Sequence, residues 1–193
     1  MKLLIVFFAI LLCVSPACAS ETFDMDTDYA ELMIASALIG DTENGRKYEL
    51  LRNQKKEALG IEDSLSYDDL FLLAKIVENE AGSIWLSDDH RKCVASVVIN
   101  RVNSTEFPDI LEDVIFQKGQ YSGVNTEYFE DLLPSEPSVR AALEIIIEGS
   151  ILPPSVVFQS EFIQGSGIHS FISDDKLETT TYFCYSNYPE LYE

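Results

Sequence analysis

The spacing of apolar residues predicts a helix over residues 67–81. At about 100° per residue, one face of this segment gathers most of its apolar side chains, namely Leu70, Leu73, Ala74, Val77 and Ala81. Lys75 and Asn79 mark the opposite side, which we expect to face water. Ser66 precedes the segment as an N-cap and Gly82 follows it as a stop signal, so both ends of the helix are defined.

The same patterns predict the other elements of the chain. Further helices are expected over about 28–39, 46–59, 87–102 and 135–149, with a short helix inside 107–117. β-Branched and aromatic residues indicate two short strands late in the chain, at 153–160 and 179–186. Helices followed by a few strands are typical of the α+β class. We therefore expect a mainly helical domain with a small late β-sheet, preceded by a helical N-terminal extension.

The first twenty residues follow a different pattern. They contain one lysine, an apolar run and then small residues, which is the order of a secretory signal peptide. A retained membrane anchor is the alternative, but the apolar run is short for a bilayer span. The sequence thus predicts a signal peptide over 1–20, a helical extension over 21–63 and the main domain over 64–193. We expect a secreted or cell-envelope-associated protein without a stable membrane span once the signal is removed.

Net charge narrows the choice of partners. The chain carries 33 acidic and 13 basic residues, a formal net charge of -20. Such a protein is repelled by polyanions, so we exclude nucleic acid and anionic membrane surfaces as partners. A neutral or cationic polymer is compatible with this charge.

Cysteine and histidine residues suggest little further chemistry. Cys93 and Cys184 follow the predicted signal peptide, and export would allow a disulfide between them. Two free buried thiols are the alternative, because sequence does not give their distance. His90 and His169 lack the spacing of metal ligands, so we expect no metal and no other cofactor.

Two carboxylates, Glu78 and Glu80, lie near the end of the 67–81 helix, and they are not equivalent. Glu80 falls between Leu73 and Ile76, inside the apolar arc, whereas Glu78 falls nearer the polar side. A carboxylate among apolar groups is costly to ionise, so its pKa rises. A general acid that works near neutral pH needs such a raised pKa. Glu80 is therefore the candidate catalytic acid, and a structural hydrogen bond is the alternative role.

Several runs of the main domain resemble the spore cortex-lytic (SleB-like) family of cell-wall hydrolases. They are DLFLLAKIVENEAG, CVASVVINRV, FPDILEDVIFQ and GQYS, with VVFQS and TYFC in place of the family's later strands. The similarity extends over residues 64–186. Two departures are visible: Ser83 and Ile84 replace a Gly-Glu pair, and Thr181-Tyr182-Phe183 stands where the family has His-x-Phe.

The resemblance implies a lysozyme-like fold for a catalytic domain over 64–193, with peptidoglycan glycan strands as substrate and Glu80 as the catalytic acid. It also implies a lytic transglycosylase, which manages with one Glu because the C6 hydroxyl of muramic acid is the nucleophile. A muramidase with a second acid is the nearest rival. A secreted binding or inhibitor protein on the same fold is the other alternative. We expect a monomer.

Candidate sugar contacts follow from the same resemblance and from side-chain chemistry. Amide, hydroxyl and aromatic groups suit N-acetyl sugars. The candidates are Gln120, Tyr121, Ser122, Gln159 and Tyr182. Ordinary packing is the alternative for the two tyrosines, and Arg101 is expected to cap or bridge its own helix.

Overall fold

The computed structural model describes residues 27–62 and 65–192, so the predicted signal peptide lies outside the described residues. Within these residues the chain forms seven α-helices, three strands and a 3-10 helix. The helices are α1 (Tyr29–Ile39), α2 (Thr42–Ala58), α3 (Tyr67–Ala81), α4 (Asp88–Val102), α5 (Leu111–Phe116), α6 (Glu127–Asp131) and α7 (Glu136–Glu148). The strands are β1 (Val156–Ser160), β2 (Ile168–Asp174) and β3 (Thr179–Tyr185), and the 3-10 helix spans Pro189–Tyr192.

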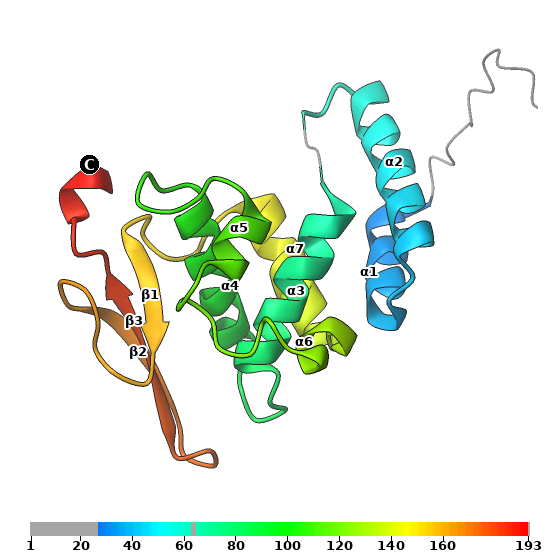
Figure 1. Ribbon diagram of the computed structural model, residues 1–193. Coiled ribbons are helices and arrows are strands. Elements are labelled where there is room, and N and C mark those ends of the chain that lie inside the picture. The colour runs from blue at the N-terminus through cyan, green and yellow to red at the C-terminus, as the bar shows by residue number, and fades with distance from the viewer. Residues whose placement is uncertain (1–26, 63–64, 193) are drawn as a thin grey trace, which may run out of the picture.

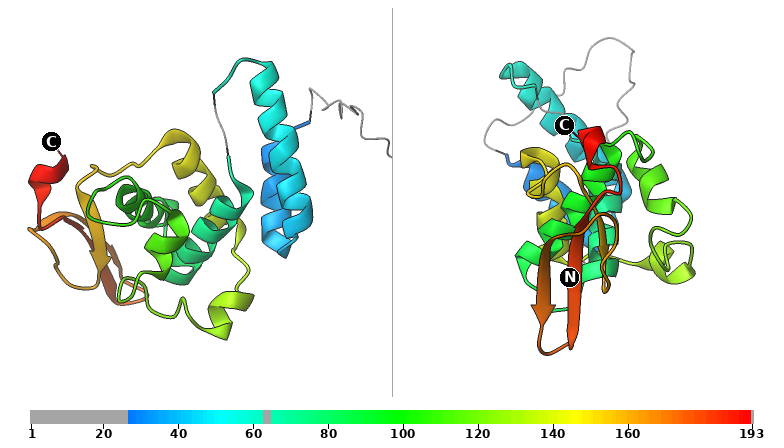
Figure 2. Two further views of the ribbon diagram at one scale, coloured as in Figure 1. Left: turned by 45° about the horizontal axis from the view of Figure 1, so that its top comes forward. Right: turned by 90° about the vertical axis from the view of Figure 1, so that its left-hand side faces the viewer.

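The helices and the sheet form separate layers. The sheet and the α1–α2 hairpin lie on opposite sides of the helices α3, α4 and α7 (Figure 1), and two further views agree (Figure 2). The predicted fold class is confirmed: the chain is α+β and mainly helical, with a small late sheet and a helical N-terminal part.

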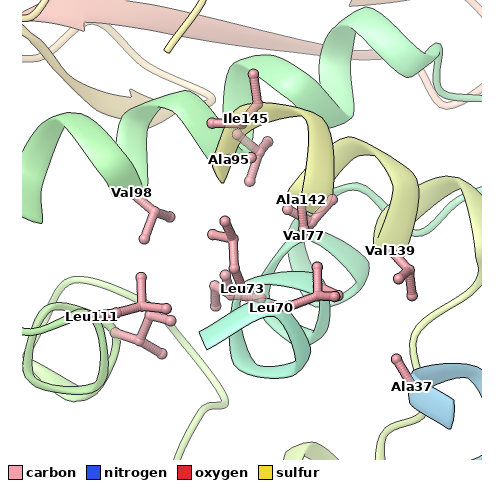
Figure 3. Packing of buried hydrophobic residues seen from close by; sticks show 14 of the residues in the cluster. Ala37, Leu70, Leu73, Val77, Ala95, Val98, Leu111, Val139, Ala142 and Ile145 are labelled. Atoms are coloured by element: carbon pink, nitrogen blue, oxygen red, sulfur yellow. The ribbon is translucent and has the colours of Figure 1, made fainter. Parts of the chain in front are cut away.

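Helix α3 runs through the centre of the core with the predicted bounds. Its N-cap is Ser66, whose Oγ accepts a hydrogen bond from the Asp69 amide at 3.2 Å. The apolar face of α3 packs against α4 and α7 (Figure 3), through Leu70, Leu73, Val77, Ala95, Val98, Val139, Ala142 and Ile145. Burying one Leu or Val contributes about 1.5–3 kcal/mol, so this face fixes α3 in place.

The other side of α3 differs from its prediction. Lys75 does not face water: it is buried, and its Nζ donates to the Glu130 carbonyl at 2.9 Å. The ammonium group also lies 4.9 Å from the centre of the Phe129 ring. Both partners belong to α6, a short helix that the sequence patterns did not predict. Because α6 covers this side of α3, a position that is polar by helical period is enclosed.

The N-terminal hairpin packs more closely than its charged sequence suggests. Met33 and Ala37 of α1 are fully buried in the same core cluster as α3. Helix α2 begins at Thr42, earlier than the expected residue 46, because Asp41 caps it by accepting from the Asn44 amide at 3.1 Å. Gly45 is therefore helical, and it lies against the ring of Tyr67. The limits of the predicted domains remain a prediction.

The sheet contains one strand more than predicted. Its order is β1-β3-β2, with both pairs antiparallel. The unpredicted strand is β2, an edge strand whose residues are exposed or half-buried, so it lacks the apolar run of a core strand. Asp174 turns the β2–β3 hairpin by accepting from the amides of Lys176 and Leu177 at 2.9 and 2.8 Å.

The possible disulfide between Cys93 and Cys184 is corrected by the structure, in which both are free, buried thiols. Cys93 of α4 packs under the sheet in a cluster with Phe183. Successive side chains of a strand point to opposite faces, so Cys184 points away from α4 where Phe183 points toward it. Burial raises the pKa of the Cys93 thiol to about 11, which keeps it protonated.

Candidate active site

A cleft of about 490 Å³ opens where the end of α3 meets the start of α4 and the sheet. Its walls carry carboxylate, amide and hydroxyl groups beside a few apolar ones. The lining residues are Glu78, Asn79, Glu80, Gly82, Ser83, Leu86, His90, Val94, Tyr128, Gln159, Ser160, Glu161, Leu177, Thr179 and Thr181. The C-terminal turn of α3 and the end of β1 thus face one another across a polar space.

Glu80 lies in the last turn of α3 and is half-buried at the wall of this cleft. Its Oε1 accepts from the Asn79 side-chain amide at 2.9 Å, and its Oε2 accepts from Gln159 Nε2 at 3.5 Å. Burial raises the pKa of Glu80 above its ordinary value of 4.5, while Asn79, Gln159 and the charge of Arg101 act in the lowering direction. The direction of this shift is the one that the apolar arc of α3 predicts.

Glu78 has a different role from Glu80, although both line the cleft. Its Oε2 accepts from the Ser135 amide at 3.0 Å, from Ser135 Oγ at 2.5 Å and from Ser138 Oγ at 2.6 Å. These donors belong to the N-terminus of α7, so Glu78 ties the end of α3 to the start of α7. The sequence placed Glu78 nearer the polar side, but it is half-buried and bonded.

Arg101 is a residue of the site that the sequence patterns missed. It does not bridge its own helix: its Nε donates to the Val157 carbonyl of β1 at 2.7 Å. The guanidinium carbon lies 5.0 Å from the centre of the Tyr121 ring and 5.3 Å from that of Phe107. A charged residue in the apolar run VVINRV was the available signal, but its partner on β1 is 56 positions away in the chain.

Of the predicted sugar contacts, only Gln159 is among the residues that line this cleft. Tyr121 is buried beside Arg101, and the Ser122 carbonyl accepts from the Asn79 side chain at 3.4 Å. Gln120, which is half-buried, is not among the lining residues. Tyr121 and Ser122 thus contact residues of the site but do not line the cleft itself.

Tyr182 is not brought to the cleft either. Its neighbours on β3, Thr181 and Thr179, line the cleft, so Tyr182 points to the opposite face of the sheet. There its ring lies 6.1 Å from that of Phe171. The two threonines are the residues that β3 presents to the cleft, and strand alternation would have separated them from Tyr182.

His90 is a second lining residue that the sequence patterns did not select. It lies in the first turn of α4, is 3% exposed and packs edge-to-face on Phe183 at 5.9 Å. Burial lowers the pKa of His90, so its ring is neutral near neutral pH. Its helical spacing of four residues to Val94, also in the lining, was the signal that could have found it.

Two properties of the described residues concern metal ions and membranes. Within residues 27–62 and 65–192, no group of three or more His, Cys, Asp and Glu side chains is placed to hold a metal ion. In the same part of the chain, no helix combines the length and the apolar character that crossing a membrane requires.

Comparison with known proteins shows which family the chain is similar to. The model of a family described as Cell Wall Hydrolase matches residues 87–183, about half of the chain. The matched segment begins at the N-cap of α4 and ends in β3. It includes Arg101 and Gln159, and it begins after Glu80. No curated protein and no solved structure matches the chain.

Proposed function

The chain belongs to the cell wall hydrolase family, and on this premise we propose that it is a lytic transglycosylase with Glu80 as its single catalytic acid. Membership indicates a hydrolase that acts on peptidoglycan, in the cell wall and outside the cytoplasm. The proposal of a lytic transglycosylase is supported by the surroundings of Glu80. This residue is a half-buried carboxylate at the cleft wall, bonded by two amides, and its pKa is raised by burial.

The reaction needs Glu80 in both protonation states. Protonated, it donates to the glycosidic oxygen, and the bond from that oxygen to C1 of muramic acid breaks. The carboxylate then accepts the proton of the C6 hydroxyl, whose oxygen bonds to C1 and closes a 1,6-anhydro ring. No water is consumed, and Glu80 ends the cycle protonated. Because the nucleophile is part of the bound sugar, proximity replaces a second carboxylate.

Asn79 and Gln159 orient the carboxylate for these steps. Each donates an amide hydrogen to a different oxygen of Glu80. Asn79 belongs to α3 and Gln159 to β1, so the carboxylate is held from both sides of the cleft. Gln159 also faces the cleft and is the sugar contact that we propose first. Thr179 and Thr181 add hydroxyl groups on the neighbouring strand.

A muramidase is the second candidate, because the cleft contains an acid that could activate water. Glu161 lines the cleft two residues after Gln159, and it is exposed. Both residues line the same cleft, so the Glu161 carboxylate has access to the space that Gln159 faces. An inverting glycosidase places its two carboxyl groups about 6.5–9.5 Å apart, with water between them.

Mass spectrometry of muropeptides after digestion of purified peptidoglycan separates the candidates. A lytic transglycosylase yields anhydro-muropeptides, each lighter by one water than its hydrolysed counterpart. We expect these products, and we expect Glu80→Gln to lower cleavage by about two to four orders of magnitude. Glu161→Gln should cleave normally, as should Glu112→Gln, which alters an exposed acid on α5. Reducing-end muramic acid together with an inactive Glu161→Gln would establish the muramidase.

Binding without turnover would indicate the third alternative, a binding or inhibitor protein.

Secretion is part of the proposal, through removal of residues 1–20, which lie outside the described residues. N-terminal sequencing of exported protein should begin near Ser20 or Glu21. Recovery of Met1 at the N-terminus of the exported protein would contradict it.

A further inference from the structure

We propose that Arg101 is a positioning residue that holds a fixed positive charge beside Glu80 and stabilises the carboxylate left after Glu80 has given up its proton. The inference rests on the proposed function, in which Glu80 is the acid. It adds a residue from a different helix, one that touches neither substrate nor reacting atoms, to the machinery of that acid.

The guanidinium of Arg101 is fixed on several sides. The residue is 3% exposed, and its Nε donates to the Val157 carbonyl at 2.7 Å. The rings of Tyr121 and Phe107 lie 5.0 and 5.3 Å from the guanidinium carbon, within the range of a cation–π contact. A charge held this way does not swing out to solvent, so its field at neighbouring groups is constant and poorly screened.

Both segments that hold Arg101 also hold Glu80. On β1, Val157 accepts from Arg101, and Gln159, two residues on, donates to Glu80. On the loop after α5, the Tyr121 ring covers Arg101, and the adjacent Ser122 carbonyl accepts from Asn79, which donates to Glu80. The contacts therefore close a ring around the space between the guanidinium and the carboxylate. The positive charge acts on Glu80 in the direction that lowers its pKa.

This ring contains polar atoms that the described protein leaves unused. Arg101 Nη1, the Tyr121 hydroxyl and Gln159 Oε1 are buried and have no hydrogen-bond partner among the described residues. Buried donors are normally satisfied, and an orphan guanidinium N–H is costly. An ionised Glu80 can use this donor through one bridging water. The orphan atoms thus mark where the carboxylate finds support once it is charged.

The proposed reaction explains why a positive charge near Glu80 would be useful. Burial alone would favour the protonated form of Glu80. When the acid then donates its proton, an isolated negative charge would be left in a half-buried site, which is costly. A lytic transglycosylase must pass through that charged state and then take a proton back. A fixed cation that forms no direct ion pair with Glu80 still offsets part of the cost of burial, so Glu80 keeps a raised pKa and can ionise.

The test measures the titration of Glu80 in two ways. One is the pH dependence of kcat/KM on purified peptidoglycan, whose alkaline limb reports loss of the acid form. The other is a ¹³C NMR titration of glutamate carboxyl carbons, in which the Glu80 signal is identified by its loss in Glu80→Gln. Other titratable groups face Glu80 as well: Glu78 on its own helix, His90 on α4, Tyr121 after α5, Tyr128 on α6 and Glu161 after β1.

We expect both midpoints to move to higher pH in Arg101→Met, because a carboxylate without the cation is harder to ionise. Arg101→Lys keeps the positive charge, so both midpoints should stay close to those of the wild type. Arg101→Gln keeps an amide donor for the Val157 carbonyl and is the neutral variant to use where Arg101→Met does not fold. Arg91→Met is the matched control, because Arg91 is also a buried arginine of α4 but bonds to Leu86 and Ser83.

Two results would overturn the inference. One is a Glu80 midpoint that is the same in wild type and in a folded neutral Arg101 variant. The other is an equal shift in Arg91→Met, which would show a general effect of losing a buried arginine. Failure of the proposed function has a separate sign, a fully active Glu80→Gln, and the NMR titration does not depend on activity.

Discussion

Two glutamates on α3 that are separated by one residue have different hydrogen-bond partners. Glu78 is occupied by three hydrogen bonds from the start of α7. Glu80 is bonded by two side-chain amides and opens onto the cleft. One carboxylate therefore holds two helices together, while its neighbour lines the cleft, as the proposed proton transfer requires.

The first prediction concerns Glu78. Glu78→Ala leaves the Ser135 amide and two hydroxyl groups without their acceptor, so we expect a loss of about 2–4 kcal/mol in the free energy of unfolding. Urea denaturation of the variant and wild type measures it. Glu112→Ala, at an exposed position of α5, is the control and should change stability little. An unchanged midpoint in Glu78→Ala would show that the α3–α7 contact is dispensable.

The second prediction concerns the stability cost of Glu80. Its pKa is raised in the folded protein, so the folded state binds its proton more tightly than the unfolded state does. Stability from this group is therefore present at low pH and is lost as pH rises above its ordinary value of 4.5. We expect Glu80→Gln to gain stability relative to wild type as pH rises above 4.5. Thermal unfolding at several pH values tests this, and a constant difference would contradict it.

Sequence patterns predict the position of Glu80 on its helix but not the residues around it, for a physical reason. The position of Glu80 follows from the helical period of α3, which is a local property. The roles of Arg101, Gln159 and Tyr182 depend on contacts between distant segments or on which face of a strand meets the cleft. Tyr182 is a candidate from the resemblance and from its side-chain chemistry, but the alternation of side chains along β3 directs it away from the cleft.

At the scale of elements, the long helices were predictable and the short or exposed elements were not. Helix α3 has a clear apolar period, and both α3 and α4 begin at a serine N-cap. Strand β2 is an edge strand with mostly polar or exposed positions, and α6 has five residues. Their structure depends on pairing with β3 and packing on α3, which the local pattern does not encode.

The third prediction concerns the contact of α2 with α3. A Cβ atom on Gly45 would come within 2.2 Å of the buried Tyr67 ring, so the two helices would have to separate. Overpacking of this kind costs about 1–3 kcal/mol, which we expect to exceed the gain of about 1 kcal/mol for Ala over Gly in a helix. Gly45→Ala should therefore lower the unfolding midpoint, whereas Lys47→Ala, at an exposed position of the same helix, should not. A more stable Gly45→Ala would show that Tyr67 moves freely.

At the scale of the whole molecule, we expect net charge to affect the approach to substrate. The chain has a formal net charge of -20, and peptide stems of peptidoglycan carry free carboxylates. Enzyme and substrate therefore repel one another over a distance that salt shortens, to about 8 Å at physiological ionic strength.

The fourth prediction is that cleavage becomes faster as salt is added at low ionic strength. The effect should appear in KM and should be weaker for glycan strands stripped of their peptide stems, because these lack the carboxylates. Initial rates over a sodium chloride series on both substrates measure it. Rates that fall with salt on intact peptidoglycan would mean that attraction, and not repulsion, governs the encounter.

The free thiol under the sheet has a practical consequence for watching the molecule open. Cys93 is 8% exposed and its thiol stays protonated because burial raises its pKa to about 11. An alkylating reagent reacts with a thiolate in contact with solvent, so Cys93 should react when the sheet lifts from α4. Cys184 is fully buried on the other side of β3. The labelling rate of Cys93 would thus report how often the sheet lifts from the helices. The labelling rate of Cys184 would report how often the outer face of the sheet becomes exposed.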